Sequence, residues 1–274
     1  SAYVNEKARL SFYADFLYPL ASSSTLKQYY KETPEGDFTP ELYTCRTELW
    51  KALHPYQMKL IRMSPAAFIH FGTTKELLQL MTKRMEEFQY LGWNSHIHTN
   101  RMQKEFAASN SYVSLGAQIG EGSYLEDCYI HQDSKIGREC VISSVTLNGQ
   151  EIPEQAVLHG LKLKSGKFVV RMYGVEDNPK ENTLFGRKLP ETLWTASVYP
   201  VCDTIEEAVN KTLDAWKNGF PIGEQTISLK DSFNQADLSA LLPWEEKLSD
   251  KVMLEEILEA IDRKENLQKL FVRI

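Results

Sequence analysis

The stretch from Val113 to Leu158, VSLGAQIGEGSYLEDCYIHQDSKIGRECVISSVTLNGQEIPEQAVL, decides the fold. An aliphatic residue returns in it about every six positions: Val113, Ile119, Leu125, Ile130, Ile136, Ile142, Leu147, Ile152 and Leu158. Small residues often follow four places later: Ala117, Ser123, Ser134, Cys140 and Ala156. Neither a helix, with its period of 3.6, nor a strand, with its period of two, gives this spacing. The pattern predicts a left-handed parallel β-helix of hexapeptide repeats, with one short strand and one turn per hexad.

The residues before the repeats follow other periods. Apolar spacing predicts a helix over 5–20 and another that starts at Pro40, after the cap residue Thr39. Residues 57–63 and 66–71 are expected to be strands, followed by a Gly-Thr turn and an amphipathic helix to about Tyr90. We interpret this order as the edge of an α/β domain.

The residues after the repeats are expected to be mainly helical. Thr204 and Gly219 bound one predicted helix, Asp237 starts a short second one, and an apolar stripe over 252–271 predicts a long third one. The expected fold class is therefore α+β. It comprises a partial α/β segment over 1–92, a short β-helix over 93–175, and a helical connector over 176–274.

Composition narrows the function classes. The net charge of −6 and the lack of Lys or Arg blocks argue against a nucleic-acid partner. No apolar run is long enough to span a membrane. The four cysteines lack zinc spacing, and we interpret them as reduced thiols of a cytoplasmic protein. A helical pattern begins almost at the first residue, which suggests a fragment of a longer chain.

The strongest candidate site is the turn Gly72-Thr73-Thr74, with His70 just before it. A helix start offers unpaired N–H groups and a partial positive charge, and glycine lets a ligand come close to the backbone. A phosphate or a sugar hydroxyl could bind there. The alternative is that Thr73 only caps its own helix, with Glu76 completing a capping box.

The other titratable candidates favour structural roles. His96 and His98 share one strand face, but no third metal ligand is evident. His131 and His159 lie among the hexads without the companion motif that a histidine base would need. Asp15 and the pair Glu126-Asp127 are expected to be solvated carboxylates. The sequence therefore predicts no metal site and no catalytic residue in this chain.

Several nucleotide-binding motifs are absent from the sequence. It contains no Walker A loop and no GxGxRL…K loop of the kind that sugar nucleotidyltransferases use, and the spacing of Gly116, Gly120 and Gly122 in the hexads does not match a GxGxxG fingerprint. The groups that would hold a nucleoside triphosphate and its magnesium are therefore missing from this sequence.

Four segments carry a family resemblance. Residues 68–77, FIHFGTTKEL, resemble the F-x-H-x-G-T-T-x-E-x turn of the fucose-1-phosphate guanylyltransferase (GDP-fucose pyrophosphorylase) family. Residues 10–17, LSFYADFL, resemble its Y-x-D-F-L helix, and residues 194–201 and 229–248 resemble its segment beyond the β-helix. The similarity covers essentially the whole chain. It is greatest to bacterial bifunctional members, in which a fucokinase follows the transferase.

This resemblance implies a reaction in which L-fucose 1-phosphate and GTP give GDP-L-fucose and pyrophosphate. Mg²⁺ is expected for the full-length enzyme and no cofactor for this chain alone, which is expected to be inactive. His70, Gly72, Thr73 and Thr74 would shape the sugar-phosphate side of the cleft. Two alternatives stay open. One is a structural β-helix module that forms a homo-oligomer. The other, less favoured, is a hexapeptide acyltransferase.

Overall fold

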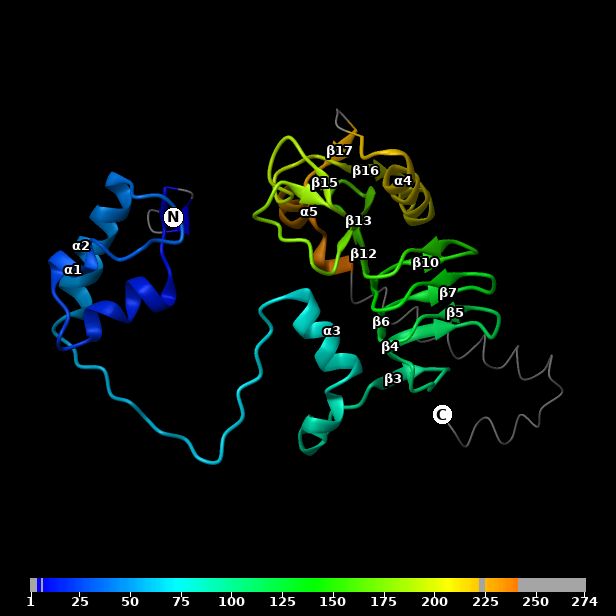
Figure 1. Cartoon of the computed structure of the whole chain (residues 1–274). Coiled ribbons are helices and arrows are strands. Elements are labelled where there is room, and N and C mark those ends of the chain that lie inside the picture. The colour runs from blue at the N-terminus through cyan, green and yellow to red at the C-terminus, as the bar shows by residue number, and fades with distance from the viewer. Residues whose placement is uncertain (1–3, 6, 222–224, 241–274) are drawn as a thin grey trace. The chain divides into compact units, whose positions relative to one another are not determined.

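The computed structural model describes residues 4–5, 7–221 and 225–240, and its chain divides into two compact units. The N-terminal unit is Ser1–Phe68 and the C-terminal unit is Ile69–Ile274 (Figure 1). The helix expected over 252–271 lies outside the described residues. The division into 1–92, 93–175 and 176–274 stays a prediction.

The N-terminal unit contains a small hairpin and helices. Strands β1 (Val4–Asn5) and β2 (Ala8–Arg9) pair antiparallel, and helices α1 (Leu26–Tyr29) and α2 (Pro40–Leu53) follow. The prediction for α2 is confirmed, because the Thr39 side chain accepts a hydrogen bond from the N–H of Leu42. The predicted helix over 5–20 is wrong. The chain forms β1 and β2 there, followed by single turns at η1 (Phe12–Phe16) and η2 (Tyr18–Leu20).

A buried ion pair lies at the centre of this unit. Nε of Arg46 lies 2.7 Å from a carboxylate oxygen of Asp15, and both side chains are fully buried. The second Asp15 oxygen accepts the N–H of Ser11, and this local bond holds the short turn η1 in place of a longer helix. The expectation that Asp15 is a solvated carboxylate is therefore wrong.

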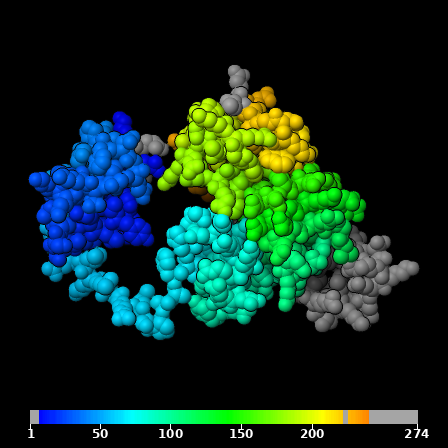
Figure 2. Space-filling view, in the orientation of Figure 1, coloured from blue at the N-terminus to red at the C-terminus, as the bar shows by residue number. Residues whose placement is uncertain are grey.

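The two strands expected over 57–63 and 66–71 are also absent. No residue from 57 to 71 belongs to a strand, and large apolar side chains there are exposed, among them Leu60 (93%), Ile61 (83%) and Phe68 (85%). Figure 2 shows this stretch as a thin, uncovered run of residues. A strand needs a neighbouring strand to satisfy its N–H and C=O groups, and no described strand lies beside this segment.

The hexad region forms a parallel solenoid with three faces. One face holds β4 (Phe106–Val113), β6 (Ser123–Glu126), β9 (Val141–Ser143) and β12 (Ala156–Lys162). The second holds the end of β4 with β7 (Tyr129–Ile130) and β10 (Thr146–Leu147), and the third holds β5 (Gln118–Ile119), β8 (Lys135–Ile136) and β11 (Glu151–Ile152). Strand β3 (His96–Thr99) pairs with β4 at the start.

The sequence pattern explains why the coils stack. All of the aliphatic residues of the pattern lie in the core except Ile119, which is partly buried against it. Ser111 and Ser123 are fully buried, and each hydroxyl accepts the N–H of a cysteine 17 residues later, Cys128 and Cys140 respectively. The corners carry stacked residues of positive φ: Asn110, Asp127 and Ser144; Asp133 and Gly149; Gly122, Glu139 and Gln155. Small side chains and left-handed corners therefore repeat once per coil.

The region after the solenoid extends its sheet and covers one end. Strand β12 turns back into β13 (Phe168–Gly174), and β16 (Tyr199–Cys202) and β17 (Thr226–Ile227) follow antiparallel. Helix α4 (Ile205–Asn218) places Ile205, Val209 and Leu213 in the solenoid core. It therefore acts as the cap that a solenoid end requires. Green and yellow residues form one continuous surface in Figure 2.

The described part of 176–240 is less helical than expected. It contains α4, α5 (Leu229–Gln235) and the turn η4 (Leu238–Ala240), but also β16, β17 and the hairpin of β14 (Thr183–Leu184) with β15 (Arg187–Lys188). A second apolar cluster joins this region to the outer side of the β12–β13 hairpin, through Leu161 and Val169. The strands form because they continue an existing sheet edge.

Candidate functional site

The Gly72-Thr73-Thr74 turn begins helix α3 (Thr74–Thr82), which is followed by the turn η3 (Met85–Leu91). Thr73 is the N-cap residue, and it forms the expected capping box with Glu76. One oxygen of Glu76 accepts the N–H groups of Gly72 and Thr73, each at 2.9 Å. Nδ1 of His70 lies 3.4 Å from the same oxygen.

These contacts limit what the turn can bind. The carboxylate of Glu76 takes the N–H groups that an anion would use, so a phosphate must displace it. Partial desolvation would raise the pKa of Glu76, but the hydrogen bonds from His70, Gly72 and Thr73 outweigh it and lower this pKa. The carboxylate therefore stays ionised at neutral pH. The turn is a well-formed helix cap that could exchange its own anion for another.

Helix α3 lies on the outer side of the solenoid face that contains β6, β9 and β12. Leu78 packs in a buried cluster with the outward residues Ala107, Tyr124, Val141 and Val157. The first turn of α3 contacts β13 and the loop behind it, because Thr74 interacts with Tyr173 and Lys75 pairs with Glu176. The contacts of α3 therefore hold the predicted Gly72-Thr73-Thr74 site beside strand β13.

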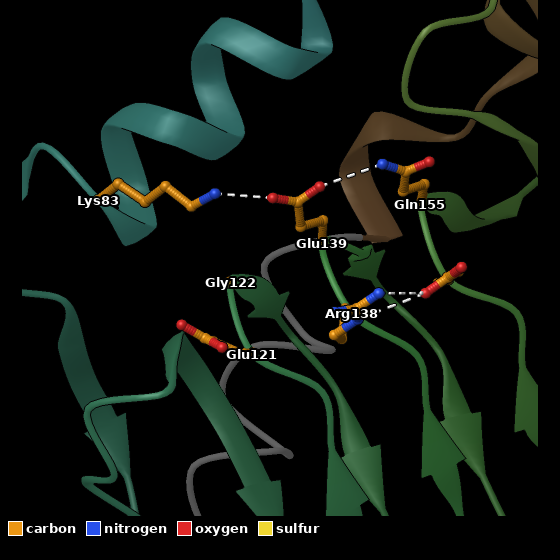
Figure 3. A pocket seen from close by; sticks show the side chains of 7 residues that line it. Lys83, Glu121, Gly122, Arg138, Glu139 and Gln155 are labelled. Atoms are coloured by element: carbon orange, nitrogen blue, oxygen red, sulfur yellow. Dashed lines mark hydrogen bonds and ion pairs between the residues drawn. The ribbon is translucent and has the colours of Figure 1, made fainter.

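The far end of α3 reaches a corner of the solenoid. Lys83 donates to Glu139 at 2.7 Å, and Gln155 donates to the other oxygen of Glu139 at 3.1 Å (Figure 3). Arg138 pairs with Glu154 at 3.2 Å beside a hollow of about 220 Å³. These charges are exposed and already paired with one another. The corner therefore joins α3 to two successive coils. Glu121 also lines the hollow and makes none of the ion pairs among the described residues, so the corner carries a net negative charge.

Two of the histidines that we expect to be structural pack against aromatic rings. His96 packs edge-on against Phe106, with ring centroids 5.7 Å apart, and burial lowers its pKa. His131 packs against Tyr129 at 4.3 Å. Within residues 4–5, 7–221 and 225–240, no three His, Cys, Asp or Glu side chains gather in a way that could hold a metal ion.

A polar row that sequence reasoning missed crosses the same outer face. The register aligns Ser109, Glu126, Ser143, His159 and Arg171 across five neighbouring strands. Nδ1 of His159 lies 2.5 Å from Nη2 of Arg171. Burial and the nearby Arg171 charge lower the pKa of His159 to about 3.

The sequence shows part of this row, because each of its polar residues in the solenoid follows an inward-facing apolar residue. Their alignment depends on the length of each coil.

The fold and the turn together define a class of protein: an α+β chain in which a mixed sheet continues a parallel solenoid, with a capped helix laid on one solenoid face. A family model described as the fucose pyrophosphorylase domain matches residues 2–204. The chain therefore belongs to the fucose pyrophosphorylase family.

Two related proteins are similar in sequence to most of the chain. The fucose-1-phosphate guanylyltransferases of Mus musculus and Homo sapiens are each 22% identical to the chain, over 86% and 88% of its length. The chain spans 48% of the length of either relative. No solved structure matches the chain significantly. Among the described helices, none has the length and apolar character needed to cross a membrane.

Proposed function

We propose that the protein takes part in making GDP-L-fucose from GTP and L-fucose 1-phosphate. The observation that carries this proposal is the family match over 2–204, together with the two guanylyltransferase relatives that align with most of the chain. Because no glycine-rich nucleotide loop occurs in the sequence, we infer that the 274-residue chain alone does not perform the reaction.

The proposed chemistry is a nucleotidyl transfer. A phosphate oxygen of the sugar phosphate forms a bond to the α-phosphorus of GTP, the bond to the bridging oxygen breaks, and pyrophosphate leaves. Mg²⁺ would balance the charge of the phosphates in the full-length enzyme. The described residues supply no set of carboxylates that fits this ion, so we assign none of them to it.

The residues that we assign to the sugar-phosphate side are His70, Gly72, Thr73 and Thr74. The position of the turn against β13 supports this assignment, and a phosphate that binds there would displace Glu76 from the N–H groups of Gly72 and Thr73. A Cβ at Gly72 would lie 2.2 Å from the His70 ring and 2.9 Å from Glu76. Gly72→Val should therefore displace both side chains and reduce turnover without unfolding the protein. Gly36→Val is the matched control, since its Cβ meets only the flexible side chain of Arg9.

We also infer the finer architecture and setting. The solenoid would be a left-handed β-helix of hexapeptide repeats, with helical segments linking it to a fucokinase in a bifunctional bacterial parent. A cytoplasmic location agrees with Cys45, Cys128, Cys140 and Cys202, which are all buried and take part in no disulfide.

The deciding experiment is release of pyrophosphate from GTP and L-fucose 1-phosphate in the presence of Mg²⁺. We expect no turnover by the 274-residue chain and turnover by the longest natural form of the protein. If the long form makes no GDP-L-fucose but makes another nucleotide sugar, the substrate assignment is wrong and the class of reaction stands. If it makes none, the proposed function is wrong.

A homo-oligomer formed through the solenoid is a second proposal. Helix α4 covers one end of the solenoid core, whereas Ile97, Met102 and Leu115 near the first coil are 45%, 69% and 58% exposed. A second copy of the chain could cover these side chains. Light scattering at high concentration checks this, and a strict monomer would contradict it.

A further inference from the structure

Arg171 is a cation without an acidic partner. It makes none of the ion pairs in the described part of the chain, and the one hydrogen bond of its side chain there is the contact of Nη2 with Nδ1 of His159. Its Nε is buried and has no hydrogen-bond partner. A guanidinium has five N–H donors, and leaving buried donors unsatisfied costs free energy. The positive charge of Arg171 is therefore not neutralised by an acid at this site.

The two acids that follow Arg171 most closely in the chain, Glu176 and Asp177, are engaged elsewhere. Glu176 pairs with Lys75. One oxygen of Asp177 accepts the N–H groups of Gly174 at 2.6 Å and Phe185 at 3.0 Å. Glu126 lies on the same polar row, but strands β9 and β12 separate it from Arg171, a distance of about 14 Å at the usual strand spacing. No carboxylate of the described chain is placed to neutralise this guanidinium.

His159 does not balance the charge of Arg171. Arg171 stays protonated, so it must donate to Nδ1 of His159, which leaves the proton of the neutral imidazole on Nε2. The imidazole therefore accepts from Arg171 without offering it a negative charge. Both side chains are half-buried and not fully enclosed.

The site lies between two packed regions on the outer side of the β12–β13 hairpin. On one side Val157 and Tyr173 contact the cluster under α3, and on the other Leu161 and Val169 join the second apolar cluster. Tyr173, two residues after Arg171 on the same face, interacts with Thr74 of the predicted turn. The lone cation therefore neighbours the turn that we assign to the sugar-phosphate side.

We propose that Arg171, with His159 beside it, binds the phosphate of a phosphate monoester. An arginine fork matches a phosphate dianion in geometry and in charge, and a partly buried setting strengthens the pair. The choice of a sugar phosphate as the natural ligand rests on the proposed function. The anion site itself rests on the unpartnered guanidinium.

The test uses the 274-residue chain and inorganic phosphate as the probe, in calorimetry at low ionic strength. We expect Arg171→Met to weaken phosphate binding at least about tenfold, as expected for loss of a charged hydrogen bond. Arg138→Met is the matched control, because Arg138 is exposed and paired with Glu154, and it should bind phosphate as the wild type does. Equal affinity of wild type and Arg171→Met, or equal affinity for acetate and phosphate, would overturn the proposal.

Thermal unfolding gives a second readout. Without an anion, Arg171→Met should be at least as stable as the wild type, because it removes an uncompensated charge. Phosphate should raise the Tm of the wild type and not that of the variant. A variant that fails to fold, or melts several degrees lower without phosphate, would assign Arg171 a structural role and overturn the proposal.

The two proposals can fail separately. L-Fucose 1-phosphate should bind the wild-type chain more tightly than inorganic phosphate does and should lose affinity in Arg171→Met. Phosphate binding that depends on Arg171, in a protein whose long form makes no nucleotide sugar, would keep the anion site and reject the enzyme. Guanylyltransferase activity in the long form, with phosphate binding unchanged in Arg171→Met, would keep the proposed enzyme and reject the anion site.

Discussion

Two arginines, one in each compact unit, are fully or partly buried and differ in their surroundings. Arg46 in the N-terminal unit is fully buried and pairs with Asp15, and it also donates to the carbonyls of Tyr29 and Glu32. Each arginine has one buried nitrogen without a hydrogen-bond partner, Nη2 of Arg46 and Nε of Arg171. Arg171 in the C-terminal unit, however, pairs with no acid among the described residues, and its side chain hydrogen-bonds only to neutral His159. The same side chain is balanced by an acid in one unit and left unbalanced in the other.

This difference separates a structural charge from the anion site that we propose at Arg171. A buried ion pair adds little net stability, but removing one partner costs a great deal because the other charge remains buried. Arg46 is therefore fixed by its environment, and the unit cannot lose Asp15. Arg171 has no acidic partner among the described residues, so the folded chain already contains the destabilising free energy of an uncompensated charge. An anion bound there would stabilise the folded chain.

The largest effect is expected from Asp15→Ala, which would bring Arg46 into the state that Arg171 already occupies. It should destabilise the N-terminal unit by about 3–5 kcal/mol, since a fully buried guanidinium loses its counter-charge. Trp50, which packs against Tyr29 in this unit, reports its unfolding by fluorescence in denaturant titrations.

Glu48→Ala is the control for this prediction. Glu48 pairs with Lys51 at 2.8 Å, but both side chains are exposed, so its loss should change stability by less than about 1 kcal/mol. Equal effects of Asp15→Ala and Glu48→Ala would show that the burial of the Arg46 pair does not govern the stability of this unit.

The C-terminal unit should instead depend on its apolar ladder. Ile142 is fully buried between Leu125 and Leu158 of the adjacent coils, and Ile142→Ala should cost about 2–5 kcal/mol through lost contacts and a cavity. Denaturant unfolding followed by circular dichroism in the strand region measures it. Ile119→Ala, at a partly buried position, should cost clearly less, and the reverse order would contradict the ladder as the main source of stability.

The sequence predicted the repeating part of the fold well for a physical reason. A solenoid coil repeats one local arrangement, so Leu125, Ile142 and Leu158 each carry the same information about burial. The capped helices were also predictable, because Thr39 and Thr73 act within one turn of chain. Non-repeating contacts were not. Asp15 finds Arg46 across 31 positions, and no local pattern records that pairing.

The candidate site was predictable only in part. The Gly72-Thr73-Thr74 turn and its capping box followed from local spacing. The alignment of His159 with Arg171 did not, because it depends on where the β12–β13 hairpin turns. The strands expected over 57–71 failed for a related reason, since alternation alone cannot supply a neighbouring strand. Local chemistry was readable from the sequence, whereas partners distant along the chain were not.

The unbalanced site should also show in the pH dependence of stability. The pKa of His159 falls to about 3 in the folded chain, through burial and the Arg171 charge, from an ordinary value near 6.5. Between these values the unfolded state binds more protons, so stability declines as the pH falls below about 6.5. The expected loss due to His159 is of the order of 1–2 kcal/mol between pH 7 and pH 5.

His159→Gln isolates this contribution, because glutamine keeps an acceptor for Arg171 and does not titrate. Denaturant unfolding of both proteins at pH 7 and pH 5 measures the difference between their slopes. Parallel pH profiles for wild type and His159→Gln would mean that His159 is not held neutral by its place beside Arg171.

The smallest effect is expected at the turn that starts α3. Thr73→Ala removes the side-chain acceptor for the N–H of Glu76 and should cost about 1 kcal/mol, whereas Thr73→Ser keeps the cap and should cost a few tenths. Amide hydrogen exchange should localise the loss of stability to the first turn of α3, beside Tyr173.

The same two variants test whether the turn belongs to the anion site. If Thr73→Ala also weakens phosphate binding to the Arg171 site while Thr73→Ser does not, the turn and the Arg171 guanidinium form one anion-binding region. Unchanged phosphate affinity in both variants would restrict Thr73 to capping its helix and leave the unpaired charge of Arg171 as the separate feature that distinguishes the C-terminal unit.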